Sequence, residues 1–435
     1  MSQTSSTAFE TTDTPKKAGA YLFPLILVTS LFFFWGFIHN LDPVLIPHLK
    51  KAFQLTDLET AFVDFSVFIA YFIMALPAGY FMRRFGYKSG IILGLALFAI
   101  GSFLFVPAAD NHQYIFFLGA LFVIACGLAF LETAANPYVT VLGDPATATQ
   151  RLNLSQSFNG LAAFLAPVIG GSIIFSETNY TDEQLNEMLP AAKEAYIAAE
   201  ASSVKGPYLT LAIIITLVTI VFIFTKLPDI KEQKDDSEKS SIAHALKHKH
   251  LVWAIIAQFF YVGAQVCVLS FFISFTTVAA SITPNEARWY AGAAGAAFML
   301  GRFAGTALMQ FISPNKLLML YAVISVVLNL VAIFAQGMIP VYALIGIAFF
   351  MSIMFPTIFS MGITGLGKDT KLGSSLIVMS IVGGAFLPLG LGYISDITGN
   401  IQYGYIVPLI CFLVVFIFGW KKWKPSLVEK PISVQ

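Results

Sequence analysis

Residues 117–137 read FLGALFVIACGLAFLETAANP, and this stretch decides the class of fold. It is apolar and long enough to cross a bilayer, which takes about 20 residues of α-helix. It also carries an ionisable side chain, Glu132, and a charge at membrane depth costs about 3 kcal/mol even on the lenient insertion scale. Such a residue faces a protein interior or a water-filled cavity. Asn136 follows four residues later, on the same helix face, so we predict a polar site inside a membrane bundle that contains Glu132, Thr133 and Asn136.

The composition of the whole chain agrees with this interpretation. Of 435 residues, 57% are hydrophobic and only 11% are charged, whereas soluble domains carry about 25% charged residues. We therefore predict a polytopic membrane protein surrounded by lipid. The net charge of +1 argues against nucleic acid as a partner. The three cysteines lie inside apolar runs without metal-ligand spacing, which favours buried structural thiols: Cys126, Cys267 and Cys411.

Apolar segments of spanning length recur along the entire chain. Measured against the 17–25 residues typical of a membrane helix, they number twelve. We expect spans at 22–47, 57–82, 89–108, 114–141, 153–175, 206–227, 251–278, 287–311, 315–335, 339–365, 372–395 and 403–420. No signal peptide is expected before the first span, which would itself direct insertion. An even number of spans places both termini on the same side of the membrane.

The distribution of basic residues indicates which side that is. If the N-terminus is inside, the cytoplasmic segments hold most of the lysines and arginines, including Arg83, Arg84, Lys88, Arg151 and the lysines of 226–249. The outer loops keep only Lys50, Lys51, Lys193, Lys205 and Arg288. The positive-inside rule then predicts cytoplasmic termini, in a bacterial inner (plasma) membrane.

The hydrophilic segment 228–249 divides the spans into two groups of six. We predict a polar N-terminus at 1–19, a six-helix bundle at 20–227, a cytoplasmic linker at 228–249, a second bundle at 250–420 and a tail at 421–435. This all-α plan is that of the major facilitator superfamily, whose substrate lies between the halves. The segment GYFMRRFGYKSG, residues 79–90, also resembles a cytoplasmic loop motif of that superfamily, although Arg83 stands in its aspartate position.

Polar side chains interrupt the first span. In SLFFFWGFIHNLDPVLIPHL, residues 30–49, the interruptions are Trp35, His39, Asn40 and Asp42. They either belong to a ligand site or form the frayed outer end of a helix, where polar groups meet water. Trp35 can equally be a packing residue or a ring that stacks on a ligand.

Neutral amides mark two further spans. Gln156 and Asn159 are three residues apart and share a helix face, as do Gln258, Tyr261 and Gln265 in the seventh span. Amides that face lipid would be costly, so they either bond neighbouring helices or bind hydroxyl groups of a ligand. Arg302 lies in an apolar context near the predicted cytoplasmic end of the eighth span, where we expect a structural ion pair or a gate.

No sequence motif for catalysis or nucleotide binding is present. The chain contains no P-loop, GxSxG or HExxH pattern, which argues against an enzyme and against an ATP-driven pump. No cofactor is expected. Uphill transport would then draw on an ion gradient.

Five segments together identify a narrower family. The segments FFFWGF followed by HNLDPVLIPHLKKAF, LETAANPYVTVLG, RLNLSQSFN, AQFFYVGAQ and PTIFSMGI resemble the fucose–galactose–glucose:cation symporter family of the major facilitator superfamily. The resemblance runs from about residue 22 to about residue 418. It implies twelve helices, alternating access and uptake of a hexose coupled to a cation. It also implies a functional role for Glu132 and a sugar cavity lined by Gln156, Asn159 and Asn40.

One departure from the family pattern concerns the coupling ion. The family usually ends its first span with N-D-I-L-x-P, whereas here Asp42 takes the asparagine's place and Pro43 replaces the aspartate. Either Asp42 acts from a shifted backbone or the carboxylate role has moved. Some relatives couple to sodium, and a sodium ion would be held by oxygens of Asp42, Glu132 and Asn136, with Thr133 as a further candidate.

The expected function is cation-coupled symport of a hexose or hexose derivative, with Na⁺ or H⁺ as coupling ion, by a monomer. The sugar can be fucose, galactose, glucose, mannose or an N-acetylhexosamine. A drug:proton antiporter of the same superfamily is one alternative. Such an antiporter would have a wider and more apolar pocket, and the helix faces rich in Gln and Asn argue against it. A sugar sensor that does not transport is the other, and it would usually carry a large signalling domain.

Overall fold

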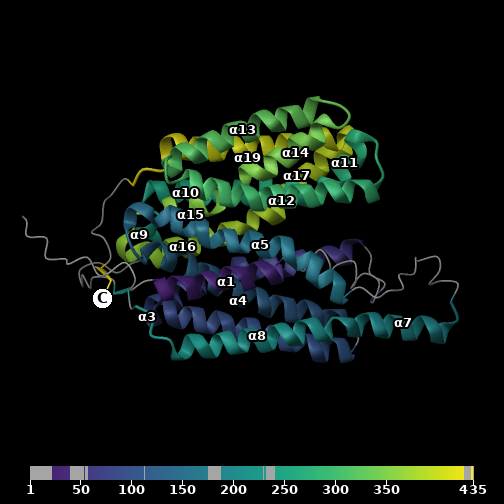
Figure 1. The fold of residues 1–435 in the computed structure, drawn as a ribbon, viewed down its shortest axis with the longest axis horizontal. Coiled ribbons are helices and arrows are strands. Elements are labelled where there is room, and N and C mark those ends of the chain that lie inside the picture. The colour runs from purple at the N-terminus through teal and green to yellow at the C-terminus, as the bar shows by residue number, and fades with distance from the viewer. Residues whose placement is uncertain are drawn as a thin grey trace, which may run out of the picture.

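The computed structural model describes residues 22–39, 53, 57–111, 113–174, 188–228, 230–231, 241–425 and 433–434. Twelve helical passes run side by side through one elongated bundle (Figure 1). They are α1 (Leu22–His39), two passes within α3 (Asp57–Asn111), α4 (Tyr114–Val141), α5 (Ala148–Ile174), α8 (Lys205–Phe224), α10 (Lys249–Ser270) continued by α11 (Phe272–Ala280), α12 (Pro284–Leu308), α13 (Pro314–Phe334), α14 (Ile339–Met351) with α15 (Met354–Ile363), α16 (Thr370–Met379) with α17 (Gly383–Thr398), and α18 (Ile401–Gly404) with α19 (Ile406–Ile417).

Short elements connect these passes. The connecting helices are η2 (Pro145–Thr147), α7 (Pro190–Ser203), α9 (Ile242–Ala245), η3 (Gly367–Asp369), η4 (Ser380–Val382) and the π-helical η5 (Phe418–Lys422). Two-residue strands, β1 (Ile230–Lys231) and β2 (Ser433–Val434), pair antiparallel. We call the end of the bundle where α8 ends and α10 begins the linker end, and the opposite end the far end.

The predicted twelve-helix, two-half architecture is confirmed. Nine helical stretches of the described chain are long and apolar enough to span a membrane, and one of them, Phe65–Asn111, contains two passes. Gly86 provides the turn between those two passes, in a positive-φ backbone (φ 83°) that favours glycine. The helices that fall short in apolarity are α5 and α12. They pack against each other between the halves, where polar side chains meet protein instead of lipid.

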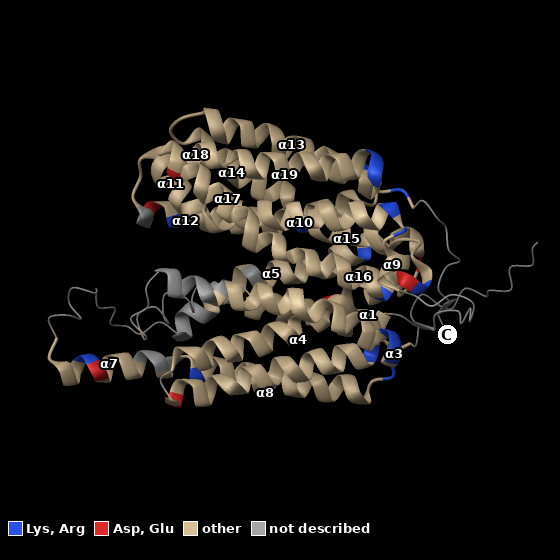
Figure 2. Cartoon of the chain, turned by 180° about the vertical axis from the view of Figure 1, so that it is seen from behind, with Lys and Arg blue, Asp and Glu red and all other residues tan. Residues whose placement is uncertain are grey.

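Each half packs mainly within itself. In the first half α3 packs on α4 and α8, and α1 packs on α5; in the second half α10 packs on α17 and α19, and α13 packs on α14 and α19. Contacts between the halves are made chiefly by α16 with α3 and α4, and by α5 with α12 and α15. Figure 2 shows the two groups of ribbons converging at the linker end and diverging toward the far end.

Side-chain hydrogen bonds fasten the halves at the linker end. Ser374 Oγ donates to the Thr133 carbonyl (3.0 Å), and Asn153 Nδ2 donates to Thr357 Oγ1 (3.2 Å). Glycine permits close approach here, since a Cβ on Gly79 would stand 2.0 Å from Ser375 Oγ. The described conformation is therefore closed at the linker end.

Candidate functional site

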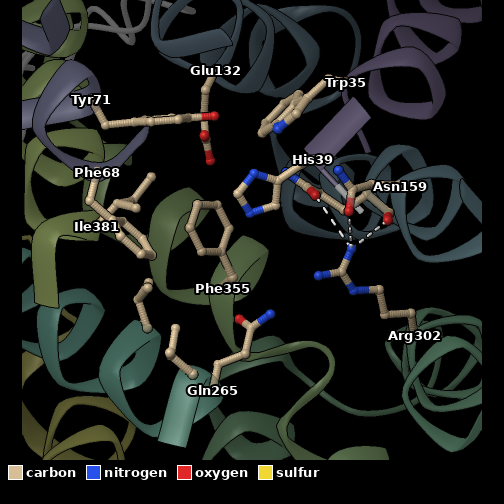
Figure 3. Close-up of a pocket in the computed structure, with 13 residues that line it drawn as sticks. Trp35, His39, Phe68, Tyr71, Glu132, Asn159, Gln265, Arg302, Phe355 and Ile381 are labelled. Carbon is tan, nitrogen blue, oxygen red and sulfur yellow. Dashed lines mark hydrogen bonds between the residues drawn. The ribbon is translucent and has the colours of Figure 1, made fainter. Parts of the chain in front are cut away.

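A cavity of about 120 Å³, open to solvent, lies between the two halves. Thirteen residues line it (Figure 3). The first half contributes Trp35, His39, Phe68, Tyr71, Glu132, Gln156 and Asn159, and the second half contributes Val262, Gln265, Val266, Arg302, Phe355 and Ile381. Its lining combines apolar walls with a few polar groups, as small-molecule pockets do.

Glu132 is the acidic group of this wall. It projects from α4 and is only 3% exposed. The Tyr71 and Glu132 side chains face each other in Figure 3. Within the described residues, no Lys, Arg or His nitrogen lies within 4.0 Å of the carboxylate oxygens, the limit for an ion pair. A buried carboxylate without a salt bridge is costly as an anion, so binding of a proton or cation stabilises it.

Arg302 brings a cation to the opposite wall. Its guanidinium reaches across from α12 to α5, where Nη1 donates to the Gln156 carbonyl at 2.6 Å and lies 3.5 Å from Asn159 Oδ1. Nε donates to the Ser352 carbonyl at 3.0 Å, and the guanidinium lies 4.7 Å from the centre of the Phe298 ring. Arg302 is thus held by neutral oxygens and a ring, and it links the two halves.

Local sequence explains why Arg302 can occupy this place. The carbonyl of Ser352 would normally accept from the N–H of residue 356, but Pro356 has none, so this carbonyl is free to accept from Arg302. On α5, Gly160 leaves the helix surface open, since a Cβ there would lie 3.3 Å from Arg302 Cδ. A helix break and a glycine therefore make room for the guanidinium.

The two amides of α5 are also held in position. Asn159 packs directly on the α1 backbone, because a Cβ on Gly36 would come within 2.8 Å of Asn159 Cγ. Gln156 Nε2 donates to Asn136 Oδ1 at 3.0 Å. Both residues line the cavity from fixed positions, and Figure 3 shows Asn159 beside the Arg302 guanidinium.

Aromatic and branched apolar side chains form the rest of the wall. Trp35 is 5% exposed and packs on Phe32, with ring centroids 5.3 Å apart. Phe355 faces the Tyr261 ring at 6.4 Å. Rings of this kind offer flat apolar faces, while the amides offer both donors and acceptors. The cavity therefore suits a small uncharged molecule with many hydroxyl groups, beside a carboxylate that can take up one cation.

Not every residue singled out by the sequence lies at the cavity. Trp35, His39, Glu132, Gln156, Asn159 and Gln265 line it. Thr133 and Asn136 are fully buried outside its wall, where Thr133 Oγ1 donates to the Ala129 carbonyl. Gln258 and Tyr261 are likewise fully buried outside it. Asn40 and Asp42 lie outside the described residues.

Several lining residues were not anticipated. Arg302 was expected near the end of its span as an ion-pair or gate residue, yet it forms part of the cavity wall. An arginine inside a membrane helix is itself a signal of function, and that signal could have placed it. Tyr71, Phe68 and Phe355 carry no such signal, because aromatic residues are abundant throughout this chain.

Comparison with known proteins defines the class. The family model described as Major Facilitator Superfamily matches residues 25–369. The chain is therefore a membrane transporter of this superfamily and not an enzyme.

Closer relatives narrow the assignment. The L-fucose-proton symporter of Escherichia coli (strain K12) is 40% identical over 407 residues, covering 92% of this chain and 93% of the relative. The glucose/galactose transporter of Brucella abortus is 41% identical over 401 residues, covering 92% and 94%. A crystal structure of the transporter FucP in the outward conformation matches with a TM-score of 0.86 at 40% identity, covering 93% and 99%. The chain belongs to the fucose–galactose–glucose:cation symporter family of the major facilitator superfamily.

Proposed function

We propose that this protein is a secondary active transporter that carries a hexose into the cell together with a proton, by alternating access. The observation that carries the proposal is the buried Glu132 carboxylate in the wall of a hydroxyl-binding cavity between the two halves. Relatives that share about 40% of the sequence over nearly the whole chain are named for L-fucose with a proton, and for glucose and galactose.

The sugar would be bound by groups from both halves. Gln156, Asn159 and Gln265 supply amide donors and acceptors for hydroxyl groups, and Arg302 supplies further N–H donors. Trp35 offers a flat apolar surface to the C–H face of a pyranose. Specificity for one hexose then depends on which hydroxyl orientation satisfies all of these groups together, because a buried donor left unpaired costs about 1–3 kcal/mol.

Coupling follows from the cost of burying a charge. When the far end closes over the cavity, an ionised Glu132 loses its access to water, and an uncompensated buried carboxylate is expensive. A proton removes that charge. The protonated, sugar-loaded protein can therefore change conformation, whereas the sugar-loaded protein with ionised Glu132 is held open.

Sodium coupling is the alternative. It would require an oxygen cage, and the expected partners of Glu132 were Asp42 and Asn136. Asn136 lies outside the cavity wall, and its Oδ1 already accepts from Gln156. This arrangement and the name of the fucose relative both favour the proton.

The direction of transport depends on how the protein is oriented in the membrane. We propose that the protein works as a monomer in a bacterial inner membrane with both termini in the cytoplasm, so that the far end faces outward. The described conformation would then be outward-facing, and the bonds of Ser374 and Asn153 between the halves would break when the cavity opens inward.

The test is uptake of radiolabelled L-fucose, galactose and glucose into proteoliposomes under separate ion gradients. We expect accumulation of at least one sugar with an acid-outside pH gradient and no sodium, abolished by a protonophore. Accumulation with a sodium gradient alone would show that the coupling ion is sodium and not the proton. If neither gradient moves a hexose, symport of these sugars is wrong, and efflux of a hydrophobic cation would then test the antiporter alternative.

A further inference from the structure

Two histidines and an aspartate converge at the linker end, and none of them lines the cavity. His244 Nδ1 lies 2.5 Å from Asp369 Oδ2, and His248 Nε2 lies 3.4 Å from the same oxygen. The three ligand atoms all lie within 4.8 Å of one another. His244 belongs to α9, in the segment between the halves, and Asp369 ends η3 at the start of α16, which packs against α9 (Figure 1).

The Asp369 side chain does not cap the helix that it begins. Asp369 is the N-cap residue of α16, a position where aspartate commonly accepts from the first backbone N–H groups of the helix. Here its side chain makes no capping hydrogen bond, and the fully buried carboxylate points at the two imidazoles instead.

His248 gives a second, independent indication of a ligand. It is fully buried, and neither ring nitrogen has a hydrogen-bond partner within the described residues. Leaving a buried polar group unpaired costs about 1–3 kcal/mol. Its Nε2 lies 3.4 Å from Asp369 Oδ2 without the geometry of a hydrogen bond, and the rings of His244 and His248 are 6.0 Å apart. The position and the missing partner both match an imidazole that awaits a metal ion.

We propose that His244 Nδ1, His248 Nε2 and Asp369 Oδ2 form a binding site for a divalent first-row transition metal ion, with zinc as the expected occupant. Imidazole nitrogens and a carboxylate oxygen are zinc ligands at about 2.0–2.2 Å, which separates tetrahedral ligand atoms by roughly 3.3 Å. The His248–Asp369 pair already has this spacing, and the His244–Asp369 pair has to open by less than about 1 Å. Water supplies the fourth ligand, and the 17% exposure of the His244 side chain provides the route of entry.

The site would join the linker to the helix that closes the linker end. Two residues after Asp369, Lys371 lies over the Tyr87 ring of α3 at 5.1 Å, and Ser374 bonds to α4. A metal ion held between α9 and Asp369 therefore stabilises the start of α16 where it meets the first half. This role is separate from sugar binding and does not depend on the proposed function.

The test uses the full-length protein in detergent, purified through a tag without histidine and freed of metal with a chelator. We expect one Co²⁺ to bind, with the visible absorption of a tetrahedral site, and Zn²⁺ to displace it. Asp369→Asn and His248→Asn should each weaken Co²⁺ binding at least about 100-fold, because each removes a metal ligand and not merely a group that hydrogen-bonds to one.

His250→Asn is the matched control. This histidine is equally buried beside the cluster, but its Nε2 is bonded to the Thr364 carbonyl at 2.9 Å and it lies outside the metal-ligand group. The control variant should bind Co²⁺ as the wild type does. Wild-type protein that binds no Co²⁺, or binds it no more tightly than the folded Asp369→Asn variant, would overturn the proposal. Thermal melting and gel filtration of each variant establish that it is folded.

Discussion

The two halves of the molecule supply different chemistry to the cavity between them. The first half provides its carboxylate, Glu132, and most of its polar side chains, including Gln156 and Asn159 on one helix. The second half provides mainly apolar surface, and its two polar groups there are Gln265 and Arg302. Of these, Arg302 reaches across to the first half.

This difference suggests a division of labour. A carboxylate that must gain and lose a proton needs polar neighbours and access to water, and these gather in the first half. An apolar wall contributes by excluding water once the halves approach. The substitutions below test this comparison between the halves, in order of the size of effect expected.

The largest effect is expected at Glu132. Glu132→Gln keeps the volume and the contact with Tyr71 but cannot exchange a proton, so accumulation against a gradient should fall at least about 100-fold. Exchange of labelled for unlabelled sugar needs no net proton movement and should persist. Glu286→Gln, at an exposed capping box on α12, should accumulate sugar normally. Uphill uptake by the Glu132→Gln protein would remove this residue from coupling.

Arg302→Lys tests the cation that the second half contributes to the cavity wall. A lysine ammonium is a point donor and cannot reproduce the planar fork that joins Ser352 and Gln156. Loss of about 1.5–3 kcal/mol of charged hydrogen bonding should lower the uptake rate about 10- to 100-fold. Arg288→Lys, exposed on the same helix, serves as the control and should transport normally. Equal rates in both variants would show that the bridge has no part in transport.

Gln265 tests whether the second half also recognises the sugar. Its amide faces the cavity (Figure 3), and no hydrogen bond within the described residues occupies it. Gln265→Ala should raise KM for the sugar about three- to tenfold, the equivalent of one hydrogen bond worth about 1 kcal/mol, with little change in the maximal rate. Gln310→Ala, exposed at the linker end of α12, should leave KM unchanged. An unaltered KM in Gln265→Ala would confine recognition to the first half and Arg302.

The smallest effect concerns stability, outside the cavity wall. Gln258 and Gln402 are both buried in the second half, but Gln402 donates to the Ala332 and Ala335 carbonyls, whereas both amide atoms of Gln258 lack a partner. Gln258→Leu should raise the free energy of unfolding by about 1 kcal/mol, and with it the melting temperature. Gln402→Leu should lower both. Thermal melts in detergent compare the two. A lower melting temperature for Gln258→Leu would indicate a partner for this amide.

The sequence allowed the fold and much of the cavity to be predicted, for a physical reason. Polar groups inside membrane helices are costly and therefore few, so Glu132, Gln156 and Asn159 stand out in an apolar background. Spacing along a helix is less informative. Glu132 and Asn136 share a face of α4, but this helix is buried on every side from Ile124 to Thr140. One of the two residues reaches the cavity, while the other contacts Gln156. The aromatic wall could not be predicted, because the rotation of each helix about its own axis is set by packing against its neighbours.

The position of the guanidinium has an evolutionary consequence. Arg302 is held chiefly by main-chain oxygens, which every amino acid possesses, so residue 352 can be exchanged for any residue small enough to sit beside Gly301 without loss of that bond. The guanidinium also depends on a missing N–H at residue 356 and is favoured by a missing side chain at residue 160, where a Cβ would lie 3.3 Å from Arg302 Cδ. Comparisons of homologues that score only reactive side chains would overlook both positions. In this transporter, the position of the Arg302 guanidinium in the cavity wall therefore depends partly on groups that are absent, the N–H of Pro356 and a side chain at Gly160.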